Sequence, residues 1–378
     1  MYKFVAALLL PLSVLAADVV APEVDASAYV LMDYHTGKIL LEKNAQQKNE
    51  PASLTKMMTS YLISDAVKHE RLHNNDLVTI SENAWRLNKD ASQNSLMFLE
   101  VGKQVSVDDL HRGIIIQSGN DASVAIAEHM AGSEAAFATM MNAYAKKLGM
   151  NHSQFKNATG LTEDGHYSSA LDLALLGAAL IRDFPDDYGL YSQKEFAWNG
   201  IKQPNRNDLL WDSSLTVDGI KTGHTKAAGY CLVSSAQQHG MRLIAVVLGA
   251  NSSKARAIES KTLLSWGFNH FDTVEALKAD QALTQARIWY GNAEQVDVGL
   301  TQAATLVIPR GRRADLKANF ALLPGLEAPL AKGQVVGKLF LQLDGKDVAE
   351  YPMVSLHDVH EGSVLSRFGD WLSKKFAN

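Results

Sequence analysis

Apolar residues along the first 270 positions follow two spacings, one typical of helices and one typical of strands. Short apolar runs at 29–32 and 39–41 flank a turn at 35–38 and indicate a β-hairpin. Longer stretches repeat apolar residues every three or four positions, as an amphipathic helix does. The pattern predicts the hairpin over 28–42, adjacent strands over 230–235 and 242–248, and helices over 53–72, most of 108–148, 171–182 and 254–266. This mixture indicates an α/β unit that ends near residue 270.

The pattern changes after that point. From about residue 285 the chain offers short segments of alternating apolar and polar residues, and Asp344-Gly345 is a strong signal for a hairpin turn. Strands are predicted over 286–290, 294–298, 304–309, 316–322 and 335–343. We therefore expect a small all-β domain, followed by a last helix over 363–376.

The terminal helix is amphipathic. At 100° per residue its apolar residues fall on one face, whereas Ser366, Arg367, Asp370, Ser373 and Lys374 fall on the other. Lys375 lies on the apolar side, where a lysine near a helix end can snorkel. An apolar face with aromatic and basic residues is typical of a helix in the membrane interface, although this one is too short to span. The alternative is packing against its own β-domain. The apolar residues are Val364, Leu365, Phe368, Trp371, Leu372 and Phe376.

The N-terminus resembles a secretory signal. Lys3 precedes an apolar stretch over 5–15, and small residues follow at Ala16 and Ala17. The stretch is short for a membrane span and contains Pro11, so we expect a signal peptide over residues 1–17 that is cleaved. The mature protein is then exported from the cytoplasm.

Composition narrows the function only a little. The chain of 378 residues is 47% hydrophobic and 20% charged, as an ordinary globular protein is. Its net charge of −5 argues against nucleic acid as a partner. Cys231 is the single cysteine, so no intrachain disulfide can form, and its apolar neighbours predict a buried strand residue.

Three short motifs carry the candidate chemistry. Ser53-Leu54-Thr55-Lys56 places a serine and a lysine one helical turn apart, where the lysine can activate the hydroxyl as a nucleophile. Ser118-Gly119-Asn120 offers a second hydroxyl and an amide. Lys221-Thr222-Gly223 offers a cation, a hydroxyl and a glycine that lets backbone approach a ligand. Together they predict an active-serine site.

Each motif alone is weak evidence. Ser153-Gln154-Phe155-Lys156 has the same spacing as the first motif, and Ser81-Glu82-Asn83 and Ser92-Gln93-Asn94 match the second. Order and context select among them, because Ser53 follows Pro51-Ala52 and begins an apolar helical pattern. Its oxygen would lie at the positive end of the helix dipole.

Three motifs of this kind in this order, with Ser-Asp-Asn in the middle, are a known signature of penicillin-binding proteins and class A β-lactamases. The middle motif of this chain is Ser-Gly-Asn, which is typical of the carboxypeptidase relatives. The chain resembles the low-molecular-mass penicillin-binding proteins, and specifically the D-alanyl-D-alanine carboxypeptidases of the penicillin-binding protein 5 and 6 type, over essentially its whole length. The resemblance rests on residues 51–59, 118–122, 205–207, 209–211 and 218–225.

This resemblance implies a transpeptidase-like α/β catalytic domain over 25–270, a β-rich domain over 271–358 and a membrane-anchoring amphipathic helix over 359–378. It also implies removal of the terminal D-alanine from peptidoglycan stem pentapeptides, acylation by β-lactams, and roles in cell-wall remodelling and cell shape. The expected location is the periplasmic face of the cytoplasmic membrane. No cofactor or metal is implied.

The residue roles follow the same resemblance. Ser53 is the expected nucleophile and Lys56 its base, while Ser118 relays a proton to the leaving amine and Asn120 holds the substrate amide. The backbone N–H groups of Ser53 and His224 suit an oxyanion hole. A cationic cluster suits the terminal carboxylate of the substrate. The expected substrate-binding residues are Lys221, Thr222, Gly223, His224, Arg206 and Arg256.

Three alternatives remain open at this point. His69-Glu70-Arg71-Leu72-His73 has the zinc-protease pattern, although it falls at the end of the helix that begins at Ser53. A class A β-lactamase would need a deacylating base, for which Glu163 is the candidate. A non-catalytic wall-binding protein is the third, against which the intact serine and lysine argue.

Overall fold

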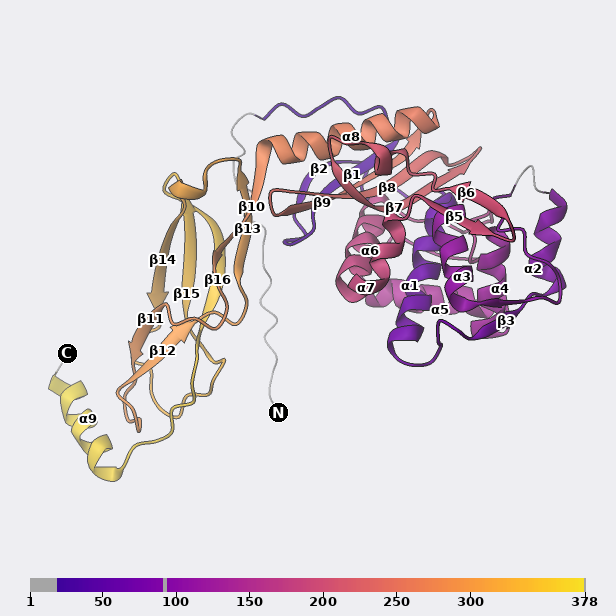
Figure 1. Cartoon of the computed structure of the whole chain (residues 1–378). Helices are drawn as coiled ribbons and strands as arrows, with labels where there is room; N and C mark the ends of the chain where they lie inside the picture. The colour runs from indigo at the N-terminus through magenta and orange to yellow at the C-terminus, as the bar shows by residue number, and fades with distance from the viewer. Residues whose placement is uncertain (1–18, 91–93, 377–378) are drawn as a thin grey trace. The chain divides into compact units, whose positions relative to one another are not determined.

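A five-stranded antiparallel sheet forms the centre of residues 20–269 in the computed structural model, which describes residues 19–90 and 94–376 (Figure 1). The predicted signal peptide therefore lies outside the described residues. Residues from 270 onward belong to a second compact unit. The sheet has the strand order β2-β1-β9-β8-β7, with bounds Ile39–Lys43, Ala28–Asp33, Met241–Ala250, Gly229–Gln238 and Thr216–Thr225. β7 is thus an edge strand.

Helices cover both faces of this sheet. In Figure 1, α8 lies on one face and α1, α6 and the other helices lie on the opposite face. A side-chain carbon at Gly267 of α8 would lie 2.5 Å from Leu243 on β9, which shows how closely that helix packs. The helices are α1 (Lys56–Lys68), α2 (Glu82–Arg86), α3 (Val107–Arg112), α4 (Asn120–Ala131), α5 (Glu134–Lys147), α6 (Ala170–Asp183), α7 (Pro185–Tyr188) and α8 (Ser253–His270).

Two short hairpins complete this unit. β3 (Leu77–Thr79) pairs with β4 (Gln104–Ser106), and β5 (Glu195–Trp198) pairs with β6 (Ile201–Pro204). The main core lies between the sheet and α1, α5 and α6, and it buries Met57, Met58, Phe137, Leu176 and Ile244 almost completely. This packing holds the start of α1 against the sheet, where the first motif lies.

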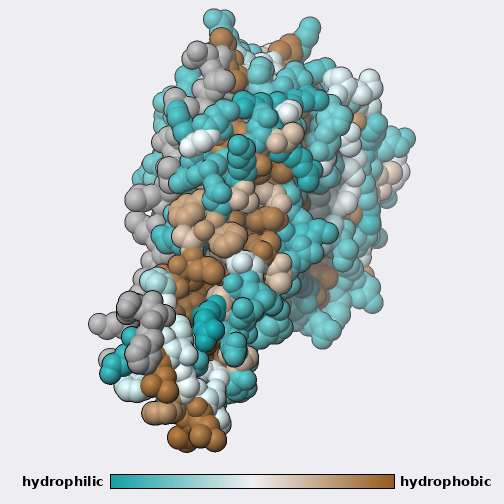
Figure 2. All heavy atoms as spheres, turned by 90° about the vertical axis from the view of Figure 1, so that its left-hand side faces the viewer, coloured by the Kyte–Doolittle hydropathy of each residue, from teal (hydrophilic) through white to brown (hydrophobic). Residues whose placement is uncertain are grey.

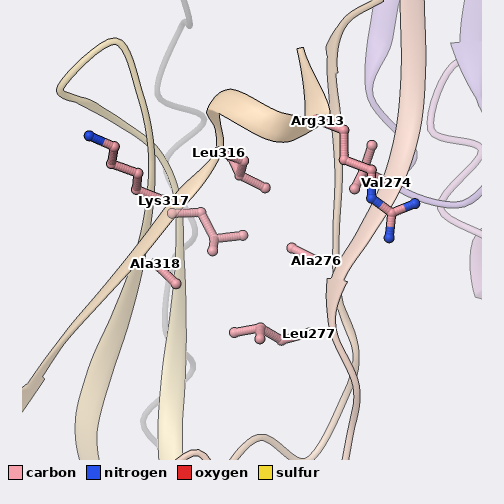
Figure 3. A pocket seen from close by; sticks show the side chains of 8 residues that line it. Val274, Ala276, Leu277, Arg313, Leu316, Lys317 and Ala318 are labelled. Carbon is pink, nitrogen blue, oxygen red and sulfur yellow. The ribbon is translucent and has the colours of Figure 1, made fainter. Parts of the chain in front are cut away.

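The second unit is a β-domain. β10 (Phe271–Leu277) pairs with β13 (Ala304–Pro309), and a five-stranded sheet has the order β11-β12-β16-β15-β14. A cavity of about 130 Å³ opens between β10 and β14, lined by apolar side chains with Arg313 and Lys317 beside them (Figure 3). The strand bounds are β11 Thr284–Arg287, β12 Gln295–Gly299, β14 Lys317–Leu322, β15 Val335–Leu343 and β16 Lys346–Ser355.

The last helix, α9 (Val364–Phe376), contacts its own domain through its polar side. The carboxylate of Asp370 accepts a hydrogen bond from the backbone N–H of Tyr290 at 2.6 Å, and Lys374 pairs with Glu327 at 2.5 Å. The apolar side chains of its opposite face are exposed, with Val364 at 83% and Leu365 at 85%. Hydrophobic side chains gather at the lower end of Figure 2, where Figure 1 places α9. No helix within residues 19–90 and 94–376 has both the length and the apolar character that a membrane crossing requires.

Most predicted elements are confirmed. The hairpin, the β8–β9 pair, the helices α6 and α9 and the turn at Asp344-Gly345, where both residues have positive φ, lie where the pattern placed them. Cys231 is buried on β8 as expected. The helix predicted over 53–72 differs, because Ala52–Thr55 is a 3₁₀ helix and α1 ends at Lys68. The alternation also missed β10 and β16, whose burial does not alternate regularly.

Candidate active site

The three motifs meet at the edge of the sheet, although they are far apart along the chain. Ser53 lies in the 3₁₀ helix that precedes α1, Ser118 lies just before α4, and Lys221 lies on β7. The Nζ atom of Lys56 lies 3.1 Å from the Oγ atom of Ser53. The Nζ atom of Lys221 lies 3.0 Å from the Oγ atom of Ser118. The structure thus contains two lysine–hydroxyl pairs, one in each half of the site.

The amine of Lys56 lies among three hydrogen-bond acceptors. Besides the Ser53 hydroxyl, its amine contacts the Oδ1 atom of Asn120 at 2.7 Å and the main-chain carbonyl of Thr159 at 2.6 Å. The side chain is 1% exposed. Burial, assisted by the charge of Arg206, lowers the pKa of Lys56 to about 7, although Asp121 and Glu134 act in the opposite direction. A substantial fraction of Lys56 is therefore neutral near pH 7.

The backbone around both serines is unusual. Ala52, just before Ser53, has φ +48°, and Ser118 has φ +61° after a π-helical turn over Gly113–Gln117. Left-handed conformations are costly for residues other than glycine, and π-turns are common at functional sites. The surrounding packing must therefore maintain these two conformations, and it aims both hydroxyls at lysines.

Two glycines allow the backbone to come close to the nucleophile segment. A Cβ atom on Gly160, where φ is +82°, would lie 1.8 Å from the carbonyl oxygen of Ala52. One on Gly223 of β7 would lie 3.0 Å from the carbonyl oxygen of Pro51. β7 and the segment around Gly160 consequently flank the 3₁₀ helix that carries Ser53.

Asn120 and its neighbour hold the middle motif in place. The Nδ2 group of Asn120 donates to the Oδ1 atom of Asn94 at 2.7 Å, so its Oδ1 atom is oriented toward Lys56. The buried carboxylate of Asp121 accepts hydrogen bonds from the backbone N–H groups of Met97 and Leu99 at 2.9 and 3.0 Å. These contacts hold the start of α4 against residues 94–99.

The cationic side of the site contains three basic residues. Lys221 is 3% exposed, and burial together with the charges of Lys56, Arg206 and Arg256 lowers its pKa well below the usual value. Arg206 is exposed and contacts the Oγ atom of Ser95. Arg256 is 6% exposed and donates to the carbonyls of Gly223 at 3.2 Å and Arg206 at 3.4 Å. Arg256 therefore braces the main chain beside the site.

The remaining predicted residues lie on the same strand. Thr222 and Gly223 are buried on β7, and His224 is exposed with its ring stacked on Tyr230 at 4.0 Å between centroids. Sequence reasoning missed Thr159, Asn94 and Asp121. Thr159 acts through its carbonyl, which every residue has, so no side-chain pattern could have revealed it. Asn94 belongs to one of the Ser-x-Asn strings that context had set aside.

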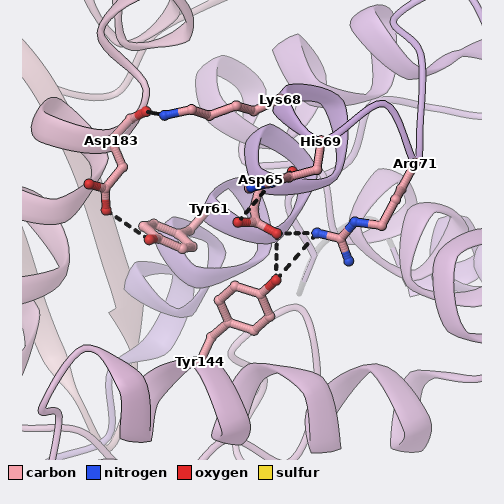
Figure 4. Close-up of polar contacts among 7 residues, drawn as sticks. All are labelled: Tyr61, Asp65, Lys68, His69, Arg71, Tyr144 and Asp183. Atoms are coloured by element: carbon pink, nitrogen blue, oxygen red, sulfur yellow. Dashed lines mark hydrogen bonds and ion pairs between the residues drawn. The ribbon is translucent and has the colours of Figure 1, made fainter.

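The His-Glu-x-x-His string does not form a helical pair of ligands. α1 ends at Lys68, and residues 69–73 form a turn and a bend (Figure 4). The ring of His69 contacts the main-chain carbonyl of Asp65 at 2.8 Å, and Arg71 pairs with the carboxylate of Asp65. Tyr144 also contacts this carboxylate. The segment thus forms a polar cluster that ties the end of α1 to α5.

Glu163, the candidate for a deacylating base, contacts Asn157. It is exposed, and its carboxylate accepts a hydrogen bond from the Nδ2 group of Asn157 at 3.0 Å. Ser153, in the competing Ser-x-x-Lys string, contacts Ser168 and Asp172 at 2.8 and 2.6 Å, and both contacts lie away from the three motifs.

Comparison with known proteins agrees with this geometry. Residues 16–252 match the family model described as D-alanyl-D-alanine carboxypeptidase, and residues 271–361 match that of the C-terminal domain of penicillin-binding protein 5. The chain is 49% identical to D-alanyl-D-alanine carboxypeptidase DacC of Escherichia coli strain K12 over 358 residues, which cover 94% of this chain and 90% of the relative. DacA of the same strain is also 49% identical, over 94% of this chain and 89% of the relative.

Solved structures show the same fold. Penicillin-binding protein 5 from Haemophilus influenzae superimposes with a TM-score of 0.87 at 48% identity, covering 91% of this chain and 100% of that one. Penicillin-binding protein 6B from Escherichia coli gives 0.75 at 42% identity, covering 88% and 96%. The chain therefore belongs to the penicillin-binding protein 5 and 6 family and is a D-alanyl-D-alanine carboxypeptidase.

Proposed function

We propose that Ser53 carries out this reaction on peptidoglycan stem pentapeptides. Its Oγ atom attacks the carbonyl carbon of the penultimate D-alanine, a C–O bond forms, and the C–N bond to the terminal D-alanine breaks. Water then hydrolyses the acyl-enzyme. The observation that carries this proposal is the contact of 3.1 Å between Lys56 Nζ and Ser53 Oγ, made by a lysine with a pKa of about 7.

The contacts of Lys56 suit a base. The Asn120 amide oxygen and the Thr159 carbonyl can only accept hydrogen bonds. In the neutral amine these two acceptors occupy both N–H groups, so the lone pair is left facing the Ser53 hydroxyl. Lys56 can therefore accept the proton of Ser53 as the nucleophile attacks.

Ser118 suits the return of a proton to the leaving amine. It contacts Lys221 at 3.0 Å, and burial of Lys221 favours proton release because a buried cation is costly. We assign to Ser118 the transfer of a proton to the nitrogen of the departing D-alanine, and to Asn120 a contact with the substrate amide.

The edge of β7 suits substrate binding. Because β7 pairs only with β8 in the sheet, its other edge can pair with an extended peptide. The backbone N–H groups of Ser53 and His224 are the proposed oxyanion hole. Lys221, Thr222 and Arg206 are the proposed contacts of the terminal carboxylate, with Arg256 bracing the backbone on which they lie.

The same serine is the proposed target of β-lactams, whose ring amide takes the place of the scissile bond. A relative supports this inference: penicillin-binding protein D2 from Listeria monocytogenes, 32% identical with a TM-score of 0.60, was solved in a cefotaxime-bound form.

We further propose that α9 holds the exported protein at the periplasmic face of the cytoplasmic membrane. The exposed apolar face of α9 and the contacts of its polar side with its own domain support this role. The family models over 16–252 and 271–361 and the division into compact units at residue 270 support a domain boundary there. The proposed limits are 25–270 for the catalytic domain, 271–358 for the β-domain and 359–378 for the anchor.

Replacement of Ser53 by alanine tests the assignment of the nucleophile. The variant is expected to release no D-alanine from a D-Ala-D-Ala peptide and to form no covalent adduct with labelled penicillin. Ser153→Ala is the matched control and is expected to behave as the wild type. An adduct on the Ser53→Ala protein would show that another residue is the nucleophile.

A further inference from the structure

We infer that His166 is a positioning residue for acylation: its neutral ring fastens residues 157–166 to Thr55 and so keeps the Thr159 carbonyl on the Lys56 amine. We call residues 157–166 the lysine loop. This inference rests on the proposed role of Lys56 as the base.

The lysine loop packs against residues 52–59, which include Ser53 and Lys56. Its Thr159 carbonyl accepts from Lys56 at 2.6 Å, and its Ala158 carbonyl accepts from the Oγ1 atom of Thr59 at 2.8 Å. Gly160 leaves no room for a side chain against the carbonyl of Ala52. The loop therefore supplies one of the two acceptors that orient the lone pair of Lys56.

His166 closes this loop against the residue next to Lys56. Its side chain is buried, and its Nε2 atom lies 2.9 Å from the Oγ1 atom of Thr55. Thr55 is itself 0% exposed. The ring also meets that of Phe155 edge to face, with 5.8 Å between centroids. His166 thus joins the end of the lysine loop to the short helix that contains Ser53.

The contacts determine which nitrogen carries the proton. The backbone N–H of Lys156 donates to Nδ1 at 3.3 Å, and a backbone N–H can only donate. Nδ1 must therefore hold a lone pair, so the hydrogen is on Nε2 and is donated to Thr55. A protonated ring would direct a second N–H at the N–H of Lys156 and lose this hydrogen bond.

The surroundings favour the neutral ring. Burial lowers the pKa of His166 to about 4, and the charge of Lys56 acts in the same direction, whereas Glu163 on the loop and Glu50 before the nucleophile act against it. The ring therefore stays neutral over the pH range in which Lys56 titrates.

Loss of the ring should alter Lys56 in a definite direction. A loosened loop admits water to the lysine amine, and burial is the largest cause of the lowered pKa of Lys56. Its pKa should then rise toward the ordinary value, which leaves less neutral lysine at pH 7. Acylation should therefore slow at pH 7. In a plot of acylation rate against pH, the rise on the acidic side, which we call the acid limb, should move to higher pH.

The experiment measures acylation by labelled penicillin between pH 5 and pH 9 for the full chain. His166→Ala is expected to reduce the second-order acylation rate at pH 7 by about two- to fivefold, because the acid limb of the pH–rate profile moves upward by about 0.5 to 1 unit. His166→Gln can place an N–H near the Nε2 position and is expected to restore most of the rate and the original limb.

His152→Ala is the matched control. This histidine contacts Asp172 on α6, its side chain is 36% exposed, and it lies outside the lysine loop. Hydrogen–deuterium exchange over residues 157–166 provides a second measurement. Exchange should be faster in His166→Ala and unchanged in His152→Ala.

Two results would overturn the inference. An unmoved acid limb in His166→Ala, even with a lowered melting temperature, would show a merely structural role, and unchanged exchange over 157–166 would show that the ring does not hold the loop. Failure of the proposed base is a separate result: Lys56→Ala would then keep near-normal acylation, whatever the His166 variants do.

Discussion

At the scale of single residues, the protonation state of Lys56 is central to the chemistry. Two lysines are buried within one site, and each lies beside a serine hydroxyl. Burial disfavours the charged form of both and lowers the pKa of each, to about 7 for Lys56. The site achieves this without a histidine contacting Ser53, which separates its chemistry from that of the serine–histidine–aspartate triads.

We expect acylation to require neutral Lys56. The pKa of Lys56 is about 7, so the rate should rise as pH increases through that value and fall about tenfold for each unit below it. Lys56→Arg should abolish acylation at every pH, because arginine is not deprotonated in proteins. Measuring labelling by penicillin from pH 5 to pH 9 tests both statements, and near-normal labelling of the arginine variant would remove Lys56 from the role of base.

Recognition of the terminal carboxylate should depend unequally on two cations. Lys221 is buried, and a desolvated charge contact is worth about 2–5 kcal/mol, whereas exposed pairs are worth about 0.2–1. Lys221→Ala should therefore lower kcat/KM for a D-Ala-D-Ala peptide by about 100-fold or more. Arg206→Ala, at an exposed position, should lower it by only about two- to fivefold.

A peptide whose terminal carboxylate is amidated is the control for this prediction. The wild type should cleave it poorly, and the two variants should discriminate less between the acid and the amide. Equal cleavage of both peptides by the wild type would contradict carboxylate recognition.

At the scale of elements, α9 is unusual because it packs against its domain with its polar side and not with its apolar side. A striped helix usually turns its apolar face to a core, but α9 contacts its domain through Asp370 and Lys374 and exposes its apolar face. The expectation of an interfacial helix therefore has a structural basis that the sequence pattern alone could not provide.

Deletion of residues 363–378 should release the protein from membranes and leave cleavage of soluble peptides nearly intact. A finer test replaces Phe368 and Leu372 with glutamate, because burying each such side chain in an interface is worth about 1.5–3 kcal/mol. Binding to vesicles containing anionic lipid should fall by more than tenfold. Ser373→Glu adds charge on the polar face and is the control; if it weakens binding as much, the exposed apolar face is not the anchor.

At the scale of the whole molecule, the candidate site lies within one compact unit. Every contact described for the candidate site joins residues between 50 and 256, within the unit of residues 20–269.

We expect residues 20–269 expressed alone to be acylated by penicillin at a rate within about threefold of that of the full chain. The reason is that the lysine pairs, the lysine loop and β7 all belong to this unit. The measurement is the acylation rate of the purified fragment, with its circular dichroism spectrum as the check on folding. A folded fragment that is not acylated would show that the β-domain contributes to the site.

The sequence by itself determined the elements whose apolar periodicity is regular and the residues whose chemistry depends on a short local spacing. Ser53 and Lys56 are one helical turn apart, so local structure alone brings them together. The apolar periodicity of α6 is likewise local and typical of a helix. The resemblance to a family then supplied the expected roles of the three motifs, whose order is read from the sequence itself.

Only the tertiary structure decided what depends on contacts between distant segments. The Thr159 carbonyl on Lys56, the bond from His166 to Thr55 and the bracing of Gly223 by Arg256 join residues 33 to 111 positions apart, and two of these contacts use main-chain oxygens that leave no mark in the sequence. Burial lowers the pKa of Lys56, and burial is a property of the packed fold. The outward direction of the apolar face of α9 is likewise a result of which side found partners on the β-domain.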